Sequence, residues 1–211
     1  MEWREAPATT ILTALTLAAS ALILSTGHLP DMAIGAGFIP LRWSPGVVPP
    51  DHAFVVPAWL TPLSATLVHG GWAHVALNLV MLAYCGQQVE KALGALSIGV
   101  LYLVGAYAAA IGQLLLGPES PMPMIGASGA ISAVVAAYAL LYGQRRARAF
   151  GPVPGAVMHV LWLATVWVGI QALVGFAGMG AAPIAVGAHV GGFVAGLLLA
   201  RPLLLWRYRS A

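Results

Sequence analysis

The chain has 211 residues, of which 60% are hydrophobic and only 7% are charged, and its mean hydropathy is +0.90. Soluble domains carry about 25% charged residues, and a domain of this size has too small a core to hide so much apolar surface. The composition therefore excludes a soluble globular protein and predicts one that resides in a lipid bilayer. In such a protein the positions of the charges matter more than their net value of +3, and no nucleic-acid partner is predicted.

Six apolar segments are long enough, or nearly so, to cross a bilayer as helices, which takes about 20 residues. In chain order they are 9–27, 74–89, 95–117, 128–142, 155–179 and 183–200. The first could be read as a signal peptide, but no clear cleavage site follows it and five further spans do. Residues 28–59 contain six prolines and are predicted to form a long outer loop rather than a spanning helix.

Basic residues predict the orientation of these spans, because cytoplasmic loops are enriched in Lys and Arg. With a cytoplasmic N-terminus, the outer side of the membrane receives only Arg42. The inner side receives Arg4, Lys91, Arg145, Arg146, Arg148, Arg201, Arg207 and Arg209. Six crossings return the C-terminus to the cytoplasm. The prediction is an all-α polytopic membrane protein in which residues 1–211 form a single six-helix domain with both termini cytoplasmic.

Polar side chains gather in the outer third of the predicted bundle. The second span begins with His74 and Asn78, the fourth begins with Ser128, and the sixth carries His189 near its outer end. The fourth span covers only about 22 Å at 1.5 Å per residue. Ser128 and the irregular "PMPMIGA" before it are therefore expected below the outer surface, within protein or beside a watery cavity. Ionisable groups inside a membrane are costly and mark functional sites by default.

These residue types suit nucleophilic catalysis. Serine becomes a good nucleophile only when a base removes its proton, and His189 is the candidate base. The backbone N–H of Ser128, at a helix N-terminus, and the side chains of His74 and Asn78 could stabilise an oxyanion. No Asp or Glu lies in the outer halves of the predicted spans. A Ser–His dyad that needs no cofactor is therefore predicted.

Other interpretations remain open for the individual residues. Serine and histidine in membrane helices often serve as hydrogen-bonding contacts between helices. A zinc site using His69, His74 and His189 is a second possibility, although the chain lacks the H-E-x-x-H pair of helical zinc proteases. A metal site is therefore not predicted.

Three short motifs occur in order along the chain: "HGGWAHVALN" from residue 69, "GASG" from residue 126 and "GAHVGGFVAG" from residue 187. They resemble the H-x4-H-x3-N, G-x-S-G and A-H-x2-G-x3-G patterns of the rhomboid intramembrane serine proteases, over residues 69–200. The resemblance implies that Ser128 is the nucleophile and His189 the base. It also implies that His74 and Asn78 stabilise the oxyanion.

Structural support is expected from small residues and from one acid. Glycines let membrane helices approach closely, and the motifs contain Gly126, Gly129, Gly192 and Gly196. His189 shares one helical face with the last two, and this face is expected to pack on the helix that begins at Ser128. The segment "VEKALG" resembles the end of the family's second helix, which implies a structural role for Glu90.

The resemblance further implies a six-helix rhomboid-like bundle that cuts transmembrane segments of other proteins near the outer face through an acyl-enzyme. The short tails and loops favour a multi-pass protein of a prokaryotic plasma (inner) membrane, and the sequence does not indicate an oligomeric state.

Two positions depart from the family. The first outer loop often carries Trp-Arg, but here Arg42 precedes Trp43 and Trp59 lacks an arginine; Ser132 replaces a tyrosine that packs on the histidine in some members.

Three other functions were weighed against proteolysis. A catalytically silent relative would bind membrane clients without cutting them, but such proteins typically lack the serine or the histidine. A small transporter would need polar groups across the whole bilayer, whereas the inner halves of the spans are nearly all apolar. A structural bundle would not need polar residues from three helices at one depth.

Overall fold

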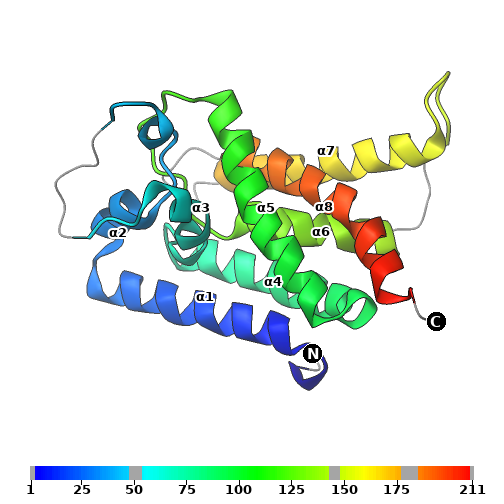
Figure 1. Ribbon diagram of the computed structural model, residues 1–211, viewed down its shortest axis with the longest axis horizontal. Coiled ribbons are helices and arrows are strands. Elements are labelled where there is room, and N and C mark those ends of the chain that lie inside the picture. Colours follow the sequence, from blue (N-terminus) through cyan, green and yellow to red (C-terminus); the bar gives the residue numbers. More distant parts are fainter. Residues whose placement is uncertain (1–2, 48–53, 143–147, 177–184, 210–211) are drawn as a thin grey trace.

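The computed structural model of the protein describes residues 3–47, 54–142, 148–176 and 185–209. These residues form helices joined by turns and two isolated bridges, and the described part of the chain contains no β-strand. The long helices are α1 (Pro7–Thr26), α4 (Trp72–Leu93), α5 (Ala95–Leu116), α6 (Ser128–Tyr142), α7 (Gly155–Phe176) and α8 (Val186–Arg207). Figure 1 shows them as a bundle with both chain termini toward one end.

Each of the six predicted spans overlaps one long helix, so the prediction of an all-α protein is confirmed. Two helices run further than predicted. Helix α4 does not stop at 89 but continues to Leu93, and α8 passes 200 and includes Pro202. Charged side chains limit a predicted membrane span, but the helix that contains them can continue beyond that limit. Residues 177–184, where the fifth predicted span ends and the sixth begins, lie outside the described residues.

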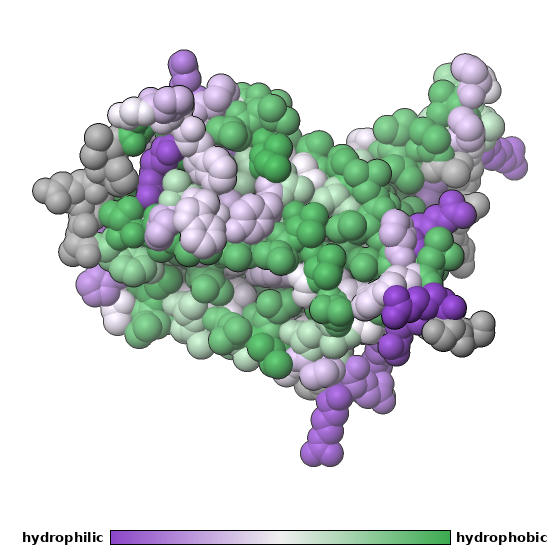
Figure 2. All heavy atoms as spheres, in the orientation of Figure 1, coloured by the Kyte–Doolittle hydropathy of each residue, from purple (hydrophilic) through white to green (hydrophobic). Residues whose placement is uncertain are grey.

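Length and composition mark some of these helices more strongly than others as membrane spans. Among the described residues, α1, α5 and α8 are each long and apolar enough to cross a bilayer. A fourth span results if residues 58–67 and α4, which meet at a bend of 92°, are counted together. Helix α6 has only 15 residues. Figure 2 shows apolar residues over most of one face, with hydrophilic residues concentrated toward its ends.

The outer segment 28–59 contains short helices, which the sequence analysis did not predict. Helix α2 (Leu29–Ala36) begins with a proline in its first turn, where the missing N–H costs nothing. Further along are η2 (Pro40–Trp43), η3 (Ala58–Leu60), α3 (Thr61–Ser64) and η4 (Ala65–Leu67). None of the helices described in this part of the chain is by itself long enough to cross a membrane, as the prolines predicted.

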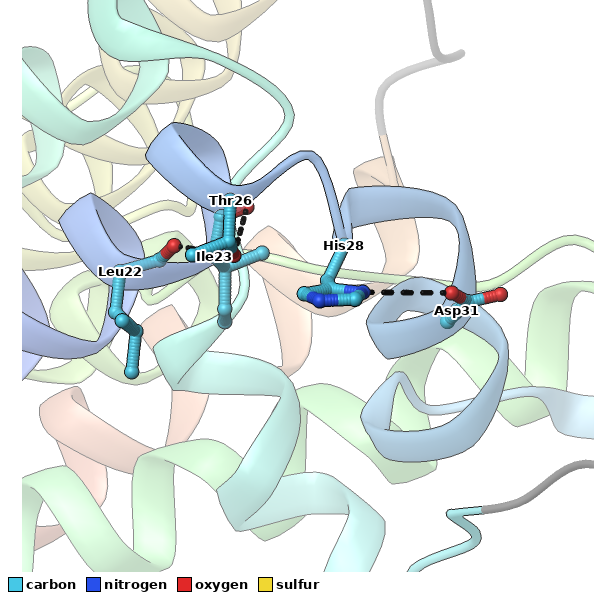
Figure 3. A network of polar contacts seen from close by, with 5 residues as sticks. All are labelled: Leu22, Ile23, Thr26, His28 and Asp31. Atoms are coloured by element: carbon cyan, nitrogen blue, oxygen red, sulfur yellow. Dashed lines mark hydrogen bonds and ion pairs between the residues drawn. The ribbon is translucent and has the colours of Figure 1, made fainter.

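Helix α1 ends in a tight turn that leads directly into α2. Gly27 adopts a left-handed conformation with φ of 75°, which a glycine accepts without strain. The Thr26 hydroxyl donates to the carbonyl of Leu22 at 2.7 Å. His28 Nδ1 and Asp31 Oδ2 lie 3.7 Å apart at the start of α2, and both side chains are exposed. Figure 3 shows these contacts at the junction.

Arg42 anchors segment 28–59 through two backbone carbonyls. Its guanidinium donates to the carbonyl of Ile34 at 3.3 Å and to the carbonyl of Val56 at 2.9 Å. These bonds join η2 to the end of α2 and to the segment before η3. An arginine fork can hold two carbonyls at once because its donors are fixed in a plane.

Glu90 fixes the N-terminal end of α1. The carboxylate is buried and accepts hydrogen bonds from the backbone N–H groups of Ala8 and Thr9, at 2.9 and 2.7 Å, and from the Thr9 hydroxyl at 2.7 Å. These N–H groups have no partner within the helix, because they belong to its first turn. A charged acceptor at a helix N-terminus is also favoured by the helix dipole. The buried acid thus holds α1 against α4.

Candidate catalytic site

Ser128 and His189 meet where α6 and α8 begin. Ser128 is the first residue of α6 and is half-buried, whereas His189 is the fourth residue of α8 and is buried. Ser128 Oγ lies 2.8 Å from His189 Nε2. A productive pair of nucleophile and base needs a separation of about 2.6–3.2 Å. The two side chains are therefore in position for proton transfer.

Glycines allow the two helices to come this close. A side chain at Gly192 would collide with the backbone carbonyl of Gly129, and one at Gly196 would collide with the carbonyl of Ala133. Gly129 in turn has no room for a side chain, because Ala109 of α5 packs against it. Backbones in contact leave little freedom for the helices to shift. The short serine–histidine distance follows from this close packing of α6 and α8.

The second ring nitrogen of His189 determines how the imidazole is protonated. If Nε2 accepts the serine proton, Nδ1 must carry the hydrogen in the neutral ring. Nδ1 is buried and has no hydrogen-bond partner among the residues that the structure describes. The histidine is therefore oriented by its packing on α6 rather than by a carboxylate. Among the described residues, the arrangement consists of a serine and a histidine without a third hydrogen-bonded side chain on Nδ1.

The backbone that leads to Ser128 is irregular, and its polar groups are paired. Met124 and Phe38 exchange two hydrogen bonds, at 2.7 and 3.0 Å, across an isolated antiparallel bridge. The N–H of Gly126 donates to the carbonyl of Ala65 at 2.9 Å. Gly126 has φ of +110°, a conformation that other residues rarely adopt. Irregular backbone can lie at membrane depth only when its groups are satisfied in this way.

His74 lies against this backbone from the side of α4. A side chain on Gly126 would approach His74 Nε2 to 2.7 Å, so the ring fills the space beside the glycine. His74 Nδ1 accepts the N–H of Gly70 at 3.3 Å. In the neutral ring Nε2 must then carry the hydrogen. His74 consequently presents an N–H donor toward the segment that precedes Ser128.

Asn78 lies one turn further along α4 and is buried. Its Nδ2 donates to the carbonyl of His74 at 2.8 Å, within its own helix. An amide group carries two N–H donors. One of them is used in this bond, and the other is available for a developing negative charge.

Ser132 links the site to α7. Its hydroxyl donates to the carbonyl of Ser128 at 2.7 Å and accepts the indole N–H of Trp167 at 2.9 Å. Sequence reasoning noted Ser132 only as a departure from a tyrosine and missed Trp167 altogether. Nothing in the spacing of α7 distinguishes this tryptophan from its neighbour Trp162, which is exposed.

His69 is fully buried and uses both ring nitrogens for contacts with the protein. Nδ1 lies 2.9 Å from the hydroxyl of Ser20 on α1, and Nε2 accepts the N–H of Ala127 at 3.2 Å. A zinc ligand would need one of these nitrogens free. Within the described residues, no group of three or more His, Cys, Asp or Glu side chains could hold a metal ion.

Comparisons with known proteins address the whole arrangement. Residues 57–206 match the family model of the Rhomboid domain, a range that includes the serine, both histidines of α4 and α8, and the asparagine. The protein named Rhomboid protease GlpG in Yersinia pestis (strain Pestoides F) is 31% identical over 196 residues, which is 92% of this chain and 62% of that protein. Its counterpart in Yersinia pseudotuberculosis serotype O:3 (strain YPIII) gives the same values.

A plant protein is similar over a shorter stretch. RHOMBOID-like protein 5 of Arabidopsis thaliana is 28% identical over 75 residues, which is 36% of this chain and 24% of the plant protein. The chain thus spans about 62% of the length of the Yersinia relatives that it matches.

Proposed function

Because the chain belongs to the rhomboid family, we propose that it is an intramembrane serine endopeptidase that cuts transmembrane segments of other membrane proteins. The observation that carries this proposal is the 2.8 Å contact between Ser128 Oγ and His189 Nε2. Serine hydroxyls in membrane helices ordinarily bond their own backbone. This hydroxyl instead faces a buried imidazole from another helix, as nucleophilic catalysis requires.

The reaction uses His189 first as a base and then as an acid. The Ser128 oxygen attacks the carbonyl carbon of the scissile peptide bond while its proton moves to His189 Nε2. The protonated imidazole then gives this proton to the leaving amine, and the peptide C–N bond breaks to leave an ester on Ser128. Water attacks the ester with His189 again as base, which releases the new carboxylate and restores the serine hydroxyl.

Three donors stabilise the negative oxygen of the tetrahedral intermediate. The backbone N–H of Ser128 lies at the N-terminus of α6, where the helix dipole favours an anion. The Nε2–H of His74 and the second N–H of Asn78 are the side-chain donors. Donors fixed in advance lower the barrier more than mobile ones do, because they need no reorganisation during the reaction.

The chain crosses the membrane six times in this proposal, with both termini in the cytoplasm and the dyad in the outer third. Three features support it: the six long helices, the position of both termini toward one end of the bundle, and the excess of basic residues in the segments assigned to the inner side. A multi-pass protein of a prokaryotic plasma membrane fits these features. Its proteolysis needs no cofactor.

Cleavage of a transmembrane substrate in liposomes tests the proposal. The wild type should cut a model single-span protein, and Ser128→Ala should not, although it remains folded. Ser97→Ala is the matched control, because this buried serine on α5 bonds only the carbonyl of Leu93 in its own helix. Equal cleavage by wild type and Ser128→Ala would show that the proposed nucleophile is wrong.

A further inference from the structure

A chain of buried hydrogen bonds connects α1 to the residue before Ser128. The Ser20 hydroxyl donates to the carbonyl of Leu67 at 3.0 Å and lies 2.9 Å from His69 Nδ1. His69 Nε2 lies 3.2 Å from the N–H of Ala127. Ser20, His69 and Ala127 each have 0% of their surface exposed. No water competes for these contacts, so each donor must face an acceptor.

The direction of every hydrogen bond in this series follows from the N–H of Ala127. A backbone N–H can only donate, so the His69 Nε2 that faces Ala127 must be an acceptor without hydrogen. In the neutral ring the hydrogen then resides on Nδ1, which donates to the Ser20 oxygen. The Ser20 hydrogen is left to point at the carbonyl of Leu67. The opposite tautomer would set two N–H groups against each other at Ala127.

We propose that Ser20 is a positioning residue for the nucleophile. By accepting from Nδ1, it holds the His69 ring in the orientation in which Nε2 binds the Ala127 N–H, and this bond fixes the peptide that leads into Ser128. Met124 and Gly126 of the same irregular segment are bound to Phe38 and Ala65. The bond from Ala127 to His69 adds a third anchor directly before Ser128. The effect on catalysis rests on the proposed function.

Ser20 lies on a helix outside the region that matches the family model, which begins at residue 57. Helix α1 contributes no side chain to the dyad or to the proposed oxyanion donors. Glu90 fixes the far end of α1 at Ala8 and Thr9, and this anchor sets how deep Ser20 reaches into the bundle. Helix α1 therefore acts on the site through the hydroxyl of its own Ser20 and the imidazole of His69.

The test combines kinetics with ¹⁵N NMR of histidine-labelled protein, which distinguishes a protonated from an unprotonated ring nitrogen. The His69 signals are assigned as those lost in His69→Gln. Wild type should show hydrogen on Nδ1 and none on Nε2. In Ser20→Ala the Nδ1 hydrogen loses the Ser20 oxygen, so the ring should turn away from Ala127. The Nε2 bond that selects the tautomer then breaks, and hydrogen should appear on both ring nitrogens. Turnover should fall about tenfold with unchanged KM, the effect of one lost hydrogen bond.

Ser25→Ala is the matched control, because this serine is on the same helix but is exposed and bonds only the carbonyl of Leu22 in its own helix. It should retain both wild-type turnover and the wild-type His69 spectrum. Wild-type turnover in Ser20→Ala with hydrogen still on Nδ1 would overturn the proposal.

The wild-type spectrum decides the matter even if Ser20→Ala fails to fold, since hydrogen on Nε2 of His69 would contradict the proposed chain directly. A wild type that cuts no substrate would count against the proposed function. The tautomer change in Ser20→Ala would still support the positioning of Ala127 by Ser20.

Discussion

Helices α8 and α7 are similar in length, yet they are attached to the bundle in opposite ways. Helix α8 packs backbone against backbone, with its glycines on the carbonyls of α5 and α6. Helix α7 lies toward the edge of the bundle in Figure 1 and exposes large apolar residues such as Leu161 and Trp162. Its link to α6 runs through a side chain, Trp167. The helix that carries His189 is thus held much more tightly than α7.

This difference indicates where the geometry of the site is most vulnerable. A side chain added to the α8 contact must push two backbones apart, because packed backbone has no flexible group that can yield. A substitution on α7 removes a bond between side chains. The distance between Ser128 and His189 should not change, because it is determined by α6 and α8. Two substitutions test this contrast directly, Gly192→Leu and Trp167→Phe. Asn78→Ala and Arg42→Ala test contacts outside both helices, and the four are given from the largest expected effect to the smallest.

Gly192→Leu should abolish cleavage although it removes no catalytic atom. The new side chain would collide with the carbonyl of Gly129 and separate His189 from Ser128. Gly169→Leu on α7 is the matched control, since no neighbouring atom lies within 4 Å of a Cβ added there. Cleavage by both variants should be measured in detergent and in liposomes, together with a folding check. Near-normal activity of folded Gly192→Leu would contradict the claim that the packing of α8 determines the distance between Ser128 and His189.

Asn78→Ala should lower turnover by up to about 10²–10³-fold, the loss seen when one strong oxyanion donor is removed. The helix should remain intact, because the amide bonds only a carbonyl of α4. Steady-state kinetics distinguishes the two roles of this residue: a transition-state donor changes kcat, whereas a residue that only binds substrate changes KM. A pure KM effect would remove Asn78 from the proposed mechanism.

Arg42→Ala should destabilise the folded protein by about 1.5–3 kcal/mol, the usual contribution of hydrogen bonds from a charged donor. The two carbonyls of Ile34 and Val56 would lose the donor that joins them. The reduction should appear as a lower Tm in detergent. An unchanged Tm would show that the outer segment is held by its apolar contacts, and that its anchoring differs from the one described here.

Trp167→Phe should have the smallest effect, about 0.5–1.5 kcal/mol of stability for the lost indole N–H. The Ser132 hydroxyl would keep its bond to the carbonyl of Ser128, so cleavage should continue at a rate within tenfold of wild type. Loss of all cleavage in a folded variant would show that α7 determines the site as strongly as α8 does, which would contradict the contrast between the two helices.

Much of this architecture is predictable from local patterns. Runs of apolar residues predicted the six helices, and short motifs predicted that Ser128 and His189 lie within hydrogen-bond distance, as their 2.8 Å contact shows. The sequence predicts where membrane spans end rather than where helices end, so it did not indicate that α4 and α8 continue past Glu90 and Arg201. Glu90 stays inside a helix because two N–H groups of α1 satisfy its charge.

Contacts between distant residues could not be predicted. Ser20 and His69 are 49 positions apart, and Ser132 and Trp167 are 35 apart. Neither pair has a periodicity or motif that would connect its members, since each contact depends on how two helices are rotated against each other. The sequence marked Arg42 as the lone basic residue of its segment and as a departure from Trp-Arg, but did not predict its bonds to the carbonyls of Ile34 and Val56.

The central claim is that His189 activates Ser128, and covalent labelling tests it most directly. Purified protein is treated with a fluorophosphonate, digested and analysed by mass spectrometry. The wild type should carry the adduct on Ser128, and folded His189→Ala should carry almost none, because without the base the hydroxyl keeps its proton. Labelling of Ser128 at the same rate in His189→Ala, or an adduct on another residue in wild type, would contradict the proposed dyad.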